Sequence, residues 1–577
     1  MGRLKPTSDA LSVAAMLLVL GGAPALVAAP AWSQTTDYQI PAGPLDLALN
    51  RYAAVSGVQV IYDSDLTAGL SSGGAAGALS EEAALSDVLA GSGLSYQFNG
   101  DGTVTISAAP PVGEDNGAFV TAPVVVTARR TEEVLQDVPA SVFVLSGEDV
   151  ERSNLRDTDD LSLLTPNVDF SGGDNPARIF FSIRGISDLN GASTGPTNGF
   201  FQDGVLQNNS GIVINNNRRL VDVDRVEVIY GPQGTAFGRG TIGGAINVVT
   251  NKPSNEFEAS LRTQFASNPD GFGEAMVNIP FTDEFAIRAV VYGGLSDGFV
   301  DLPFGDTEDS IGSEEVGGRF SVRFTPTDRL TFDGSVQFDH TSVDAPTFAI
   351  ESSVNNSNPA ALNGTIDGLD IDRLNLRGEV AYDFDFGTLR ATSAYNDTEF
   401  TGGEDFDFSP PNNSFIIRDS TERVFSQELR FESEQFNLPP GLGTISTNLG
   451  FIYSDMTRDN NPAFVTNFFG GPGGNQTINV LDITNIGVFG DVRWRPIEPL
   501  EVTVGARFSR DKAKFATEIR PSGTFTAFVQ PLIFADERTY TSVTPSASIS
   551  YDWTDDITTY LSFSTGYRPG GLVGTLA

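Results

Sequence analysis

Residues Val221–Pro253 read VDVDRVEVIYGPQGTAFGRGTIGGAINVVTNKP, and this stretch decides the fold. Two segments rich in β-branched residues, Val223–Tyr230 and Gly244–Thr250, flank a connection dense in glycine. Glycine permits backbone angles and close approaches that a side chain would forbid. The stretch therefore predicts two strands with a compact connection, as in a folded unit and not in a flexible linker.

Within this stretch, Gly238–Gly243 spells G-x-G-x-x-G, a pattern that also occurs in dinucleotide-binding folds. That fingerprint needs a strand directly before it and a helix that opens on its last glycine. The residues that follow, Ala245–Val249, are β-rich, and no helical period comes after them. We therefore expect no nucleotide site here.

Composition limits the classes of function open to the 577 residues, a length that predicts two to four domains. With 35 Lys and Arg against 74 Asp and Glu, the net charge of −39 argues against nucleic acid as a partner, because phosphate binding needs a basic face. The acidic excess either attracts cationic ligands or, more commonly, is a solvated surface. Without cysteine and with His340 as the one histidine, thiolate metal sites and disulfides are excluded and no catalytic constellation is present. We expect no resident metal, no bound cofactor and no enzymatic activity.

The N-terminus, residues 1–33, has the pattern of a secretory signal peptide. Arg3 and Lys5 precede an apolar run, Ala10–Leu20, and small residues follow at Ala29–Ser33. The run is shorter than the roughly 20 apolar residues that a membrane helix needs. We expect an exported chain without a membrane helix.

Residues 36–107 predict a small α+β domain. An amphipathic helix around Leu45–Ala53, a strand at Val58–Tyr62, a second helix after Ser80, and a hairpin from Leu94 to Ile106 follow in order. Residues 108–123 are rich in Pro, Ala and Gly without periodicity, so they predict a linker.

The glycine-rich stretch resembles the end of the plug domain of TonB-dependent outer-membrane receptors, whose recurrent sequence is close to RVEV-x-x-GPQG…IGG-x-I-N-x-x-T-x-x-P. Two further segments, FFSIRGI (Phe180–Ile186) and GFFQDGV (Gly199–Val205), are similar to plug strands of that family. The resemblance implies an α+β plug over residues 138–253. It marks these plug-motif residues: Arg184, Gly185, Asp203, Gly204, Gly231, Pro232, Gly234, Gly238, Gly243, Gly244 and Asn247. Arg184 and Arg239 either pair with carboxylates of a surrounding barrel or are plain surface arginines.

The domain at residues 36–107 resembles the short N-terminal (STN) domain shared by secretins and signalling TonB-dependent receptors. The resemblance implies a periplasmic domain that contacts an inner-membrane anti-sigma regulator. The alternative is a folded appendage without a retained partner.

Val124-Val125-Val126-Thr127-Ala128 resembles the TonB box. Three consecutive valines favour an extended backbone, and nothing adjacent in the sequence offers a paired strand. The implied partner is TonB, energised by the ExbB/ExbD complex, which would add this segment to an exposed sheet edge. The alternative is an ordinary first strand of the plug.

From residue 256 to 577 the pattern is that of long strands. Leu330–Phe338 and Val502–Phe508 alternate apolar and polar residues. Short connections such as Thr282–Glu284 alternate with long ones, among them Val343–Asp372, Thr401–Ser420, Arg458–Gln476 and Ala513–Arg538. Both features are typical of a transmembrane β-barrel with short periplasmic turns and long outer loops. We expect about 13 antiparallel strands in outer-membrane lipid, against about 22 in large plugged transporters, and hence an incomplete barrel from a fragment or a truncated gene product.

Candidate ligand contacts lie in one plug loop and two outer loops. In the plug loop they are Asn190, Thr194 and Asn198; in the outer loops they are Phe408, Phe468 and Phe469, which either stack on an aromatic or hydrophobic ligand or pack the loops. Val300–Glu315 carries six acids and no base, which disfavours a strongly anionic ferric catecholate.

The sequence therefore predicts a mainly β protein: an incomplete transmembrane antiparallel β-barrel with an internal α+β plug and a small periplasmic α+β domain. The resemblance implies an outer-membrane active transporter of a small-molecule ligand, expected to be a ferric siderophore, with iron present only inside the transported chelate. The alternatives are uptake of an oligosaccharide, a cobalamin-like or an aromatic solute, a receptor used only for signalling, a secretin-like channel subunit, or a truncated product that does not transport.

Overall fold

The computed structural model divides the chain into two compact units, Met1–Ala122 and Pro123–Ala577. The structure describes residues 36–61, 67, 70–89, 92, 94–99, 103–108, 124–171, 180–187, 196–207, 218–266, 270–296, 312–343, 368–405, 414–461, 463–466, 473–523, 531–554 and 557–570. The predicted signal segment at residues 1–33 and nearly all of the predicted linker lie outside the described residues.

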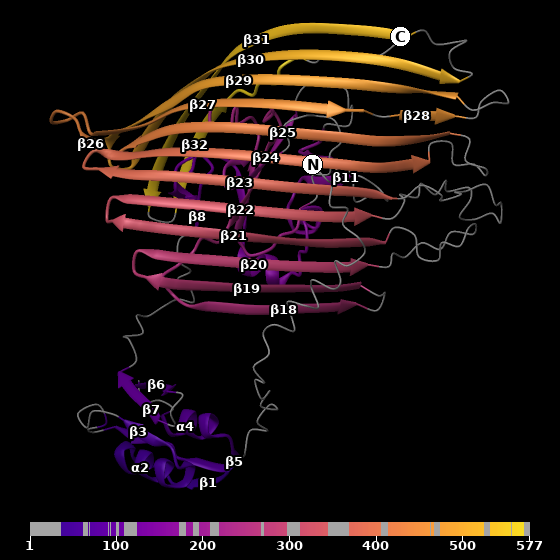
Figure 1. Ribbon diagram of the computed structural model, residues 1–577. Coiled ribbons are helices and arrows are strands. Elements are labelled where there is room, and N and C mark those ends of the chain that lie inside the picture. The colour runs from indigo at the N-terminus through magenta and orange to yellow at the C-terminus, as the bar shows by residue number, and fades with distance from the viewer. Residues whose placement is uncertain are drawn as a thin grey trace. The chain divides into compact units, whose positions relative to one another are not determined.

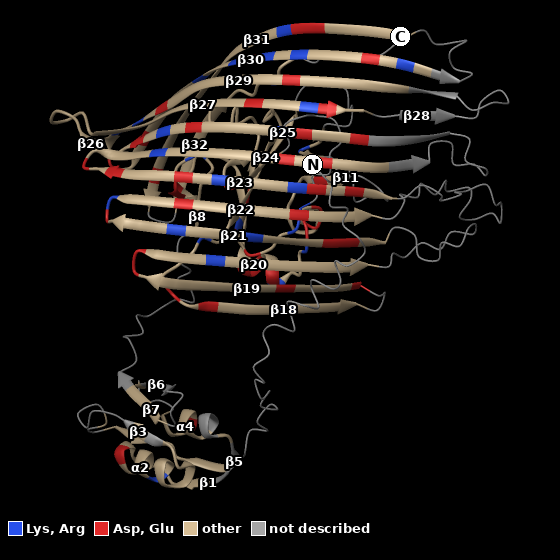
Figure 2. Ribbon diagram, viewed as in Figure 1, with Lys and Arg blue, Asp and Glu red and all other residues tan. Residues whose placement is uncertain are grey.

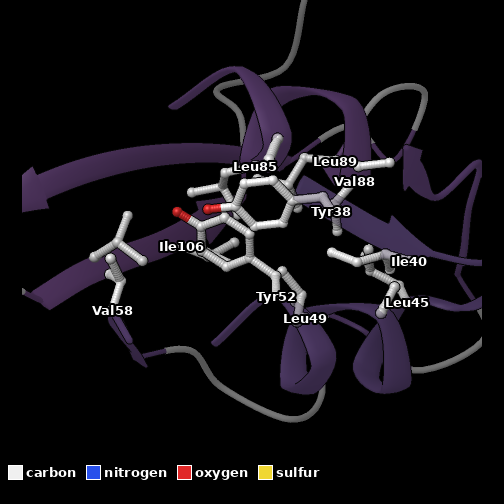
Figure 3. Close-up of a cluster of buried hydrophobic side chains, with 14 residues drawn as sticks. Tyr38, Ile40, Leu45, Leu49, Tyr52, Val58, Leu85, Val88, Leu89 and Ile106 are labelled. Atoms are coloured by element: carbon white, nitrogen blue, oxygen red, sulfur yellow. The ribbon is translucent and has the colours of Figure 1, made fainter. Parts of the chain in front are cut away.

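The N-terminal unit is an α+β domain with two helices, α2 (Leu45–Ser56) and α4 (Glu81–Leu89). Its sheets are β3-β7-β6 (Gln59–Ile61, Thr103–Ala108 and Leu94–Asn99), β1-β5 (Thr36–Ile40 and Ala75–Leu79) and β2-β4 (Gly43–Pro44 and Ser71–Ser72). The apolar faces of both helices meet in one core, where Tyr38 stacks on Tyr52 with ring centroids 5.9 Å apart (Figure 3). The predicted helices and the predicted hairpin are confirmed.

The plug is built on a five-stranded sheet in the order β10-β16-β17-β14-β15. The bounds are β10 Val142–Ser146, β16 Val223–Tyr230, β17 Gly244–Thr250, β14 Asn198–Gln202 and β15 Val205–Leu206. The strands β16 and β17 have the bounds that the opening stretch predicts. β14 pairs with β17 in parallel, whereas the other pairs are antiparallel.

Smaller elements complete the plug. A second sheet joins β11 (Val168–Ser171), β12 (Phe180–Ile183) and β13 (Ile186–Ser187), and the short helices are η1 (Leu135–Asp137), α5 (Gly147–Arg152) and α6 (Leu161–Leu164). Ser146 and Asp149 form a capping box that begins α5. Among the described residues, no helix is both long and apolar enough to cross a membrane.

One large antiparallel sheet forms the rest of the second unit, and Figure 1 shows its long strands side by side in a curved wall. In the described residues the path runs β18-β19-β20-β21-β22-β23-β24-β25-β27-β29-β30-β31-β32, with β18 and β32 at its two ends and with β26 and β28 beside it. The bounds are β18 Glu258–Ala266, β19 Asp270–Thr282, β20 Phe285–Ser296, β21 Ser313–Thr327, β22 Leu330–Val343, β23 Leu369–Phe384, β24 Gly387–Asp405, β25 Ser414–Ser433, β26 Phe436–Asn437, β27 Thr444–Asn460, β28 Ala463–Thr466, β29 Gly473–Ile497, β30 Leu500–Gly523, β31 Leu532–Thr554 and β32 Ile557–Ser564. The thirteen strands of the path confirm the predicted number.

The wall has an apolar outer face and a polar inner face, as the alternation predicts. Phe338 and Val504 are exposed, whereas Thr503 and Arg507 are buried. Charged residues of both signs lie on neighbouring strands (Figure 2). At the end with the short turns, aromatic rings follow one another from strand to strand: Phe281, Phe285, Phe324, Phe332, Tyr382, Phe384, Phe386 and Phe431. Such a girdle marks a membrane interface.

The outer connections differ from the sequence prediction. The predicted loops Thr401–Ser420, Arg458–Gln476 and Ala513–Arg538 are partly strand, because β24, β25, β29, β30 and β31 extend into them. The short strand β28 pairs with β25 and β29 in the same region. Backbone pairing continues there beyond the apolar band, since it depends on the neighbouring strand and not on hydropathy.

Candidate functional site

The segment Val124–Ala128 begins a hairpin that folds back onto the plug. Within it, β8 (Val125–Val126) pairs antiparallel with β9 (Glu133–Val134). The turn is closed by the backbone N–H of Arg130, which donates to the carbonyl of Thr127 at 2.9 Å, and Arg130 has a positive φ of 66°. The expectation that no neighbouring segment offers a paired strand is therefore wrong, because the partner strand lies seven residues further along the chain. Charged residues there gave no sequence signal for a strand.

The two faces of this segment differ in burial. Val126 and Ala128 are buried in a cluster with Val138, Phe201, Ile229, Phe237 and Ala245. Val124 and Val125 are instead 44% and 39% exposed. The hairpin therefore presents an accessible valine pair while its other side chains hold it to the plug.

A buried carboxylate fixes the centre of the hairpin. Glu227, on β16 and 0% exposed, accepts hydrogen bonds from the backbone N–H and the hydroxyl of Thr127, both at 2.8 Å. It also accepts from Arg225 Nε at 2.8 Å and from Asn247 Nδ2 at 3.4 Å. A buried carboxylate is tolerated when donors surround it in this way. Glu227 is thus the link between the predicted TonB box and the predicted plug motif.

Sequence reasoning did not single out Glu227 as a site residue. The signal lies in an acidic residue between Val226 and Val228, which are both buried, directly opposite Asn247. Asn247, a predicted motif residue, donates to the Thr127 hydroxyl at 3.2 Å and accepts from the N–H of Gly204.

An ionic cluster attaches the hairpin to the barrel wall. Arg129 Nε donates to Glu133 at 2.7 Å, and Arg129 Nη1 lies 3.3 Å from Glu501 of β30. Arg493 of β29 pairs with Glu133 and donates to the Thr131 hydroxyl at 2.8 Å. We call Arg129, Glu133, Arg493 and Glu501 the hairpin clamp. Burial lowers the pKa of Arg129, but Glu133 and Glu501 outweigh it and hold that pKa above its usual value.

Arg130 anchors the turn of the hairpin. Its guanidinium lies 4.9 Å from the ring centre of Phe237, donates to the carbonyl of Gly204 at 2.7 Å, and lies 3.4 Å from Glu428 of β25. A Cβ on Gly204 would come within 2.9 Å of Arg130 Nη1, and Gly204 has a φ of 77°. Glycine is therefore required at this predicted motif position.

The other predicted motif residues shape the plug. Asp203 accepts from the N–H and hydroxyl of Thr250, Gly185, Gly231 and Gly238 have positive φ, and Pro232 follows Gly231 at the end of β16. A Cβ on Gly234, Gly243 or Gly244 would lie 2.4 Å or less from Thr565 O, Asn198 Oδ1 or Ile229 O. After the G-x-G-x-x-G sequence comes β17 and not a helix, so the nucleotide fingerprint is absent, as predicted.

Arg184 and Arg239, for which the sequence allows either a barrel carboxylate as partner or a plain surface position, differ in their contacts. Arg239 is 5% exposed and lies 3.8 Å from Asp511 of β30, so it pairs with the barrel wall. Arg184 is exposed; it covers the Tyr230 ring at 4.8 Å and donates to Ser141, both within the plug.

A cavity of about 520 Å³ lies between the hairpin side of the plug and the wall. Plug residues Arg130, Asp203 and Lys252 line it. On the wall it is lined by alternating bases and acids, among them Arg377, Glu379, Arg390, Glu428, Arg430 and Glu432. On the opposite side of the plug, Asp222 forms buried ion pairs with Arg288 and Arg319, 2.6 and 2.8 Å long.

Three family models match this architecture. The TonB-dependent receptor-like beta-barrel model matches residues 346–576, the plug domain model of TonB-dependent receptors residues 134–245, and the short-domain model of secretin and TonB N-termini residues 58–109. The chain belongs to the TonB-dependent receptor family. It is therefore an outer-membrane protein with a periplasmic STN domain.

Curated TonB-dependent relatives include siderophore receptors. The ferripyoverdine receptor of Pseudomonas aeruginosa is 26% identical over 44% of this chain and 33% of its own length. The ferric-pyoverdine 358 receptor of Pseudomonas putida is 23% identical over 93% of this chain and 69% of its own length. The chain thus matches only a third of the length of the first of these relatives.

Solved receptor structures share the fold. The ferric yersiniabactin uptake receptor of Yersinia pestis aligns with a TM-score of 0.65 at 19% identity, over 75% of this chain and 65% of that one. The ferripyoverdine receptor of Pseudomonas aeruginosa, solved with ferripyoverdine bound, aligns with a TM-score of 0.60 at 18% identity, over 93% and 71%. A plug match argues against a secretin-like subunit, because secretins lack a plug.

The predicted ligand contacts of this receptor are mostly untested. Asn190, Thr194, Phe408, Phe468 and Phe469 lie outside the described residues. Asn198 is described, and there the prediction is wrong: it is 0% exposed, and its amide donates to the carbonyls of Phe181 and Ile186 at 3.2 and 2.7 Å. It joins β14 to β12 and β13, and its side chain is not accessible to a ligand from solvent.

Proposed function

We propose that this protein is a TonB-dependent outer-membrane transporter of a ferric siderophore that also signals through its STN domain. The observation that carries the proposal is the hairpin: its valine pair is accessible, while Glu227 and the hairpin clamp tie it to both plug and wall. The printed names of the relatives, ferripyoverdine and ferric-pyoverdine receptors, support the ligand class. Iron is cargo inside the chelate, the protein holds no resident cofactor, and no catalytic step is needed.

The proposed mechanism begins with ligand binding on the outer side of the plug. Binding favours the state in which the hairpin is released. TonB then pairs with Val124–Ala128 by strand addition, replacing the pairing of β8 with β9. The competition is favourable to TonB because β8 has only two ladder residues to exchange. Pulling on the released segment, powered through ExbB/ExbD, would open the plug beside the 520 Å³ cavity.

Uptake of an iron-59 chelate by a deletion strain expressing the protein tests the transport proposal. Val126→Pro removes a backbone donor from the TonB box, so uptake should fall to the level of a strain without TonB. The control is Val55→Ala, at an exposed position of α2 in the STN domain, and it should leave uptake unchanged. Alanine is used there because Val55→Pro would disturb the STN domain. Uptake that proceeds normally with Val126→Pro would contradict a role for the box.

Signalling is separable from transport in this proposal. Deletion of residues 36–107 should leave uptake intact and abolish ligand-dependent induction of target genes through an anti-sigma regulator. A receptor used only for signalling would show no TonB-dependent uptake even with the STN domain present. Loss of uptake on deletion would show that the two functions are not separable.

A further inference from the structure

A second, smaller cavity of about 80 Å³ lies at the opposite end of the barrel from the short turns. The plug supplies Arg218 and Arg219, and the wall supplies Tyr292 of β20, Glu315 of β21, Asp339 of β22 and Arg373 of β23. These wall residues lie toward the strand ends that the long connections join. The cavity is therefore on the side from which an external ligand would arrive.

Arg218 stands out in this cavity because most of its guanidinium group has no hydrogen-bond partner in the described part of the chain. Among the described residues, its Nε and Nη1 atoms are buried without a hydrogen-bond partner. Its neighbour Arg219 instead pairs with Glu315 and lies 3.8 Å from Asp157. In a chain with 74 acidic residues, a buried guanidinium with two nitrogens that no described carboxylate accepts from calls for a specific reason.

The acids around the cavity are already engaged. Asp339 accepts from the Tyr292 hydroxyl and from the Gln337 amide at 3.2 Å, and Glu315 is bound to Arg219. Arg373 adds a second buried guanidinium, 5% exposed. Burial and then the like charge of Arg373 lower the pKa of Arg218, and Asp339 opposes them only in part.

A buried cation without its counterion destabilises the folded state. Such a residue is commonly kept where a ligand provides the missing charge. Guanidinium groups bind carboxylates and other planar or tetrahedral oxyanions by paired, charge-assisted hydrogen bonds. The cavity has room for a group of that size but not for a whole siderophore.

We propose that Arg218, with Arg373 beside it, forms a subsite for a compact oxyanionic group, such as a carboxylate, on the transported ligand. The identification of that ligand as the transported one rests on the proposed function, but anion binding at Arg218 does not. On sequence alone, the acidic stretch Val300–Glu315 disfavours a strongly anionic ligand. If Arg218 binds the negative group, an acidic ligand remains compatible with that stretch.

Isothermal titration of the purified full chain in detergent micelles, with citrate and then inorganic phosphate, tests the subsite. We expect saturable binding of at least one oxyanion, weakened about tenfold or more in Arg218→Gln and unchanged in Arg152→Gln, an exposed arginine of α5. The tighter of the two probes distinguishes a carboxylate from a phosphate. Absence of saturable binding of both, or equal affinity in Arg218→Gln, would overturn the proposal.

Thermal unfolding separates a binding role from a structural one. Arg218→Met should leave the Tm unchanged or raise it without anion, and it should abolish the rise in Tm that citrate produces in the wild type. Arg219→Met, next to it and ion-paired with Glu315 and Asp157, should lower the Tm without anion. An equal loss of Tm in both variants would refute the proposal. Failed iron uptake together with intact, Arg218-dependent anion binding would refute the transport function and leave the subsite standing.

Discussion

Glu227 is the residue on which the state of the hairpin depends. Its carboxylate receives donors from the TonB-box segment, from its own strand and from β17, so it holds three parts of the chain in one place. Hydrogen bonds to a charged group contribute about 1.5–3 kcal/mol each, and losing one partner leaves the others buried and unmatched. Glu227 therefore holds the TonB-box segment against the plug sheet, in addition to being part of the buried core.

We predict that Glu227→Gln loosens the hairpin without unfolding the plug. The amide keeps one acceptor oxygen but adds an N–H₂ donor that faces the donors of Thr127 and Arg225, at a cost of about 2 kcal/mol. Hydrogen exchange of the amide of Thr127 should accelerate about 30-fold. Glu148→Gln, an exposed residue of α5, is the control and should leave this exchange unchanged. An unaltered exchange rate in Glu227→Gln would show that the carboxylate does not hold the segment.

The cap of α5 is a second residue-scale feature. The Ser146 hydroxyl accepts from the N–H of Asp149 at 3.1 Å, and Asp149 accepts from both the N–H and the hydroxyl of Ser146. These hydrogen bonds from Ser146 lower the pKa of Asp149. Because the folded-state pKa is depressed, the stabilisation is present above the ordinary aspartate pKa and is lost as the pH falls through the lower, folded value.

We predict that Ser146→Ala destabilises α5 locally by about 1 kcal/mol at neutral pH. Hydrogen exchange of amides 149–152 should accelerate correspondingly, and the difference from the wild type should shrink as the pH falls below about 3.9. A difference that persists undiminished at lower pH would contradict the assignment of the carboxylate to the cap.

Single residues were predictable where the family's plug motif contains them. Gly204 and Gly244 are such motif positions, and the structure supplies the reason for glycine there, a positive φ at Gly204 and a close contact with Ile229 O at Gly244. The role of Asn198 was not predictable, because the two carbonyls that satisfy its buried amide come from strands that meet it only in the fold. Arg218 is likewise indistinguishable in sequence from its paired neighbour Arg219.

At the scale of elements, the hairpin β8–β9 and its clamp form the part of the plug that we propose to move. The clamp joins two plug residues, Arg129 and Glu133, to Arg493 and Glu501 on adjacent wall strands. All four side chains are at most 18% exposed, so their pairing is screened less by salt than surface pairs are. The clamp therefore sets how readily the hairpin leaves the wall.

We predict that Arg493→Gln raises the fraction of released hairpin before any ligand binds. Glu133 loses its wall partner, a change of about 1–3 kcal/mol. A spin label on Val125→Cys, free of competing thiols because the chain has no cysteine, should become more mobile in Arg493→Gln. Arg520→Gln, at an exposed pair on β30, is the matched control. Equal mobility in both variants would show that the clamp does not restrain the hairpin.

Elements were predictable where local pattern and tertiary structure agree. The strands β16 and β17 have their predicted bounds, because β-branched residues next to a glycine-rich connection are a local signal. The pairing partner of β8 was missed because Glu133 has a low β-propensity and β9 has only two residues. The outer ends of β24, β25 and β29–β31 were missed for a related reason, since polar strands there are held by their neighbours.

At the scale of the whole molecule, the two sides of the plug are attached to the wall differently. On the β20–β21 side, Asp222 is buried between Arg288 and Arg319, and the cavity at Arg218 is small, about 80 Å³. On the β25–β30 side, the hairpin stands beside the large cavity lined by charged side chains. Breaking a buried pair by removing one partner costs about 3–5 kcal/mol, so the Asp222 side is the one expected to stay in place. The alternation of apolar and polar residues along the strands predicts the barrel. The difference between the two sides of the plug can be seen only in the packed structure.

The central claim is that the hairpin must open for transport, and a reversible covalent lock tests it most directly. Val125 and Val134 face each other in the β8–β9 ladder, and the chain contains no other cysteine, so Val125→Cys/Val134→Cys can form one defined disulfide. We predict that chelate uptake is abolished under oxidising conditions and restored by reductant, while each single variant transports normally in both. If the double variant took up the chelate as fast under oxidising conditions as it does after reductant is added, the account would be contradicted.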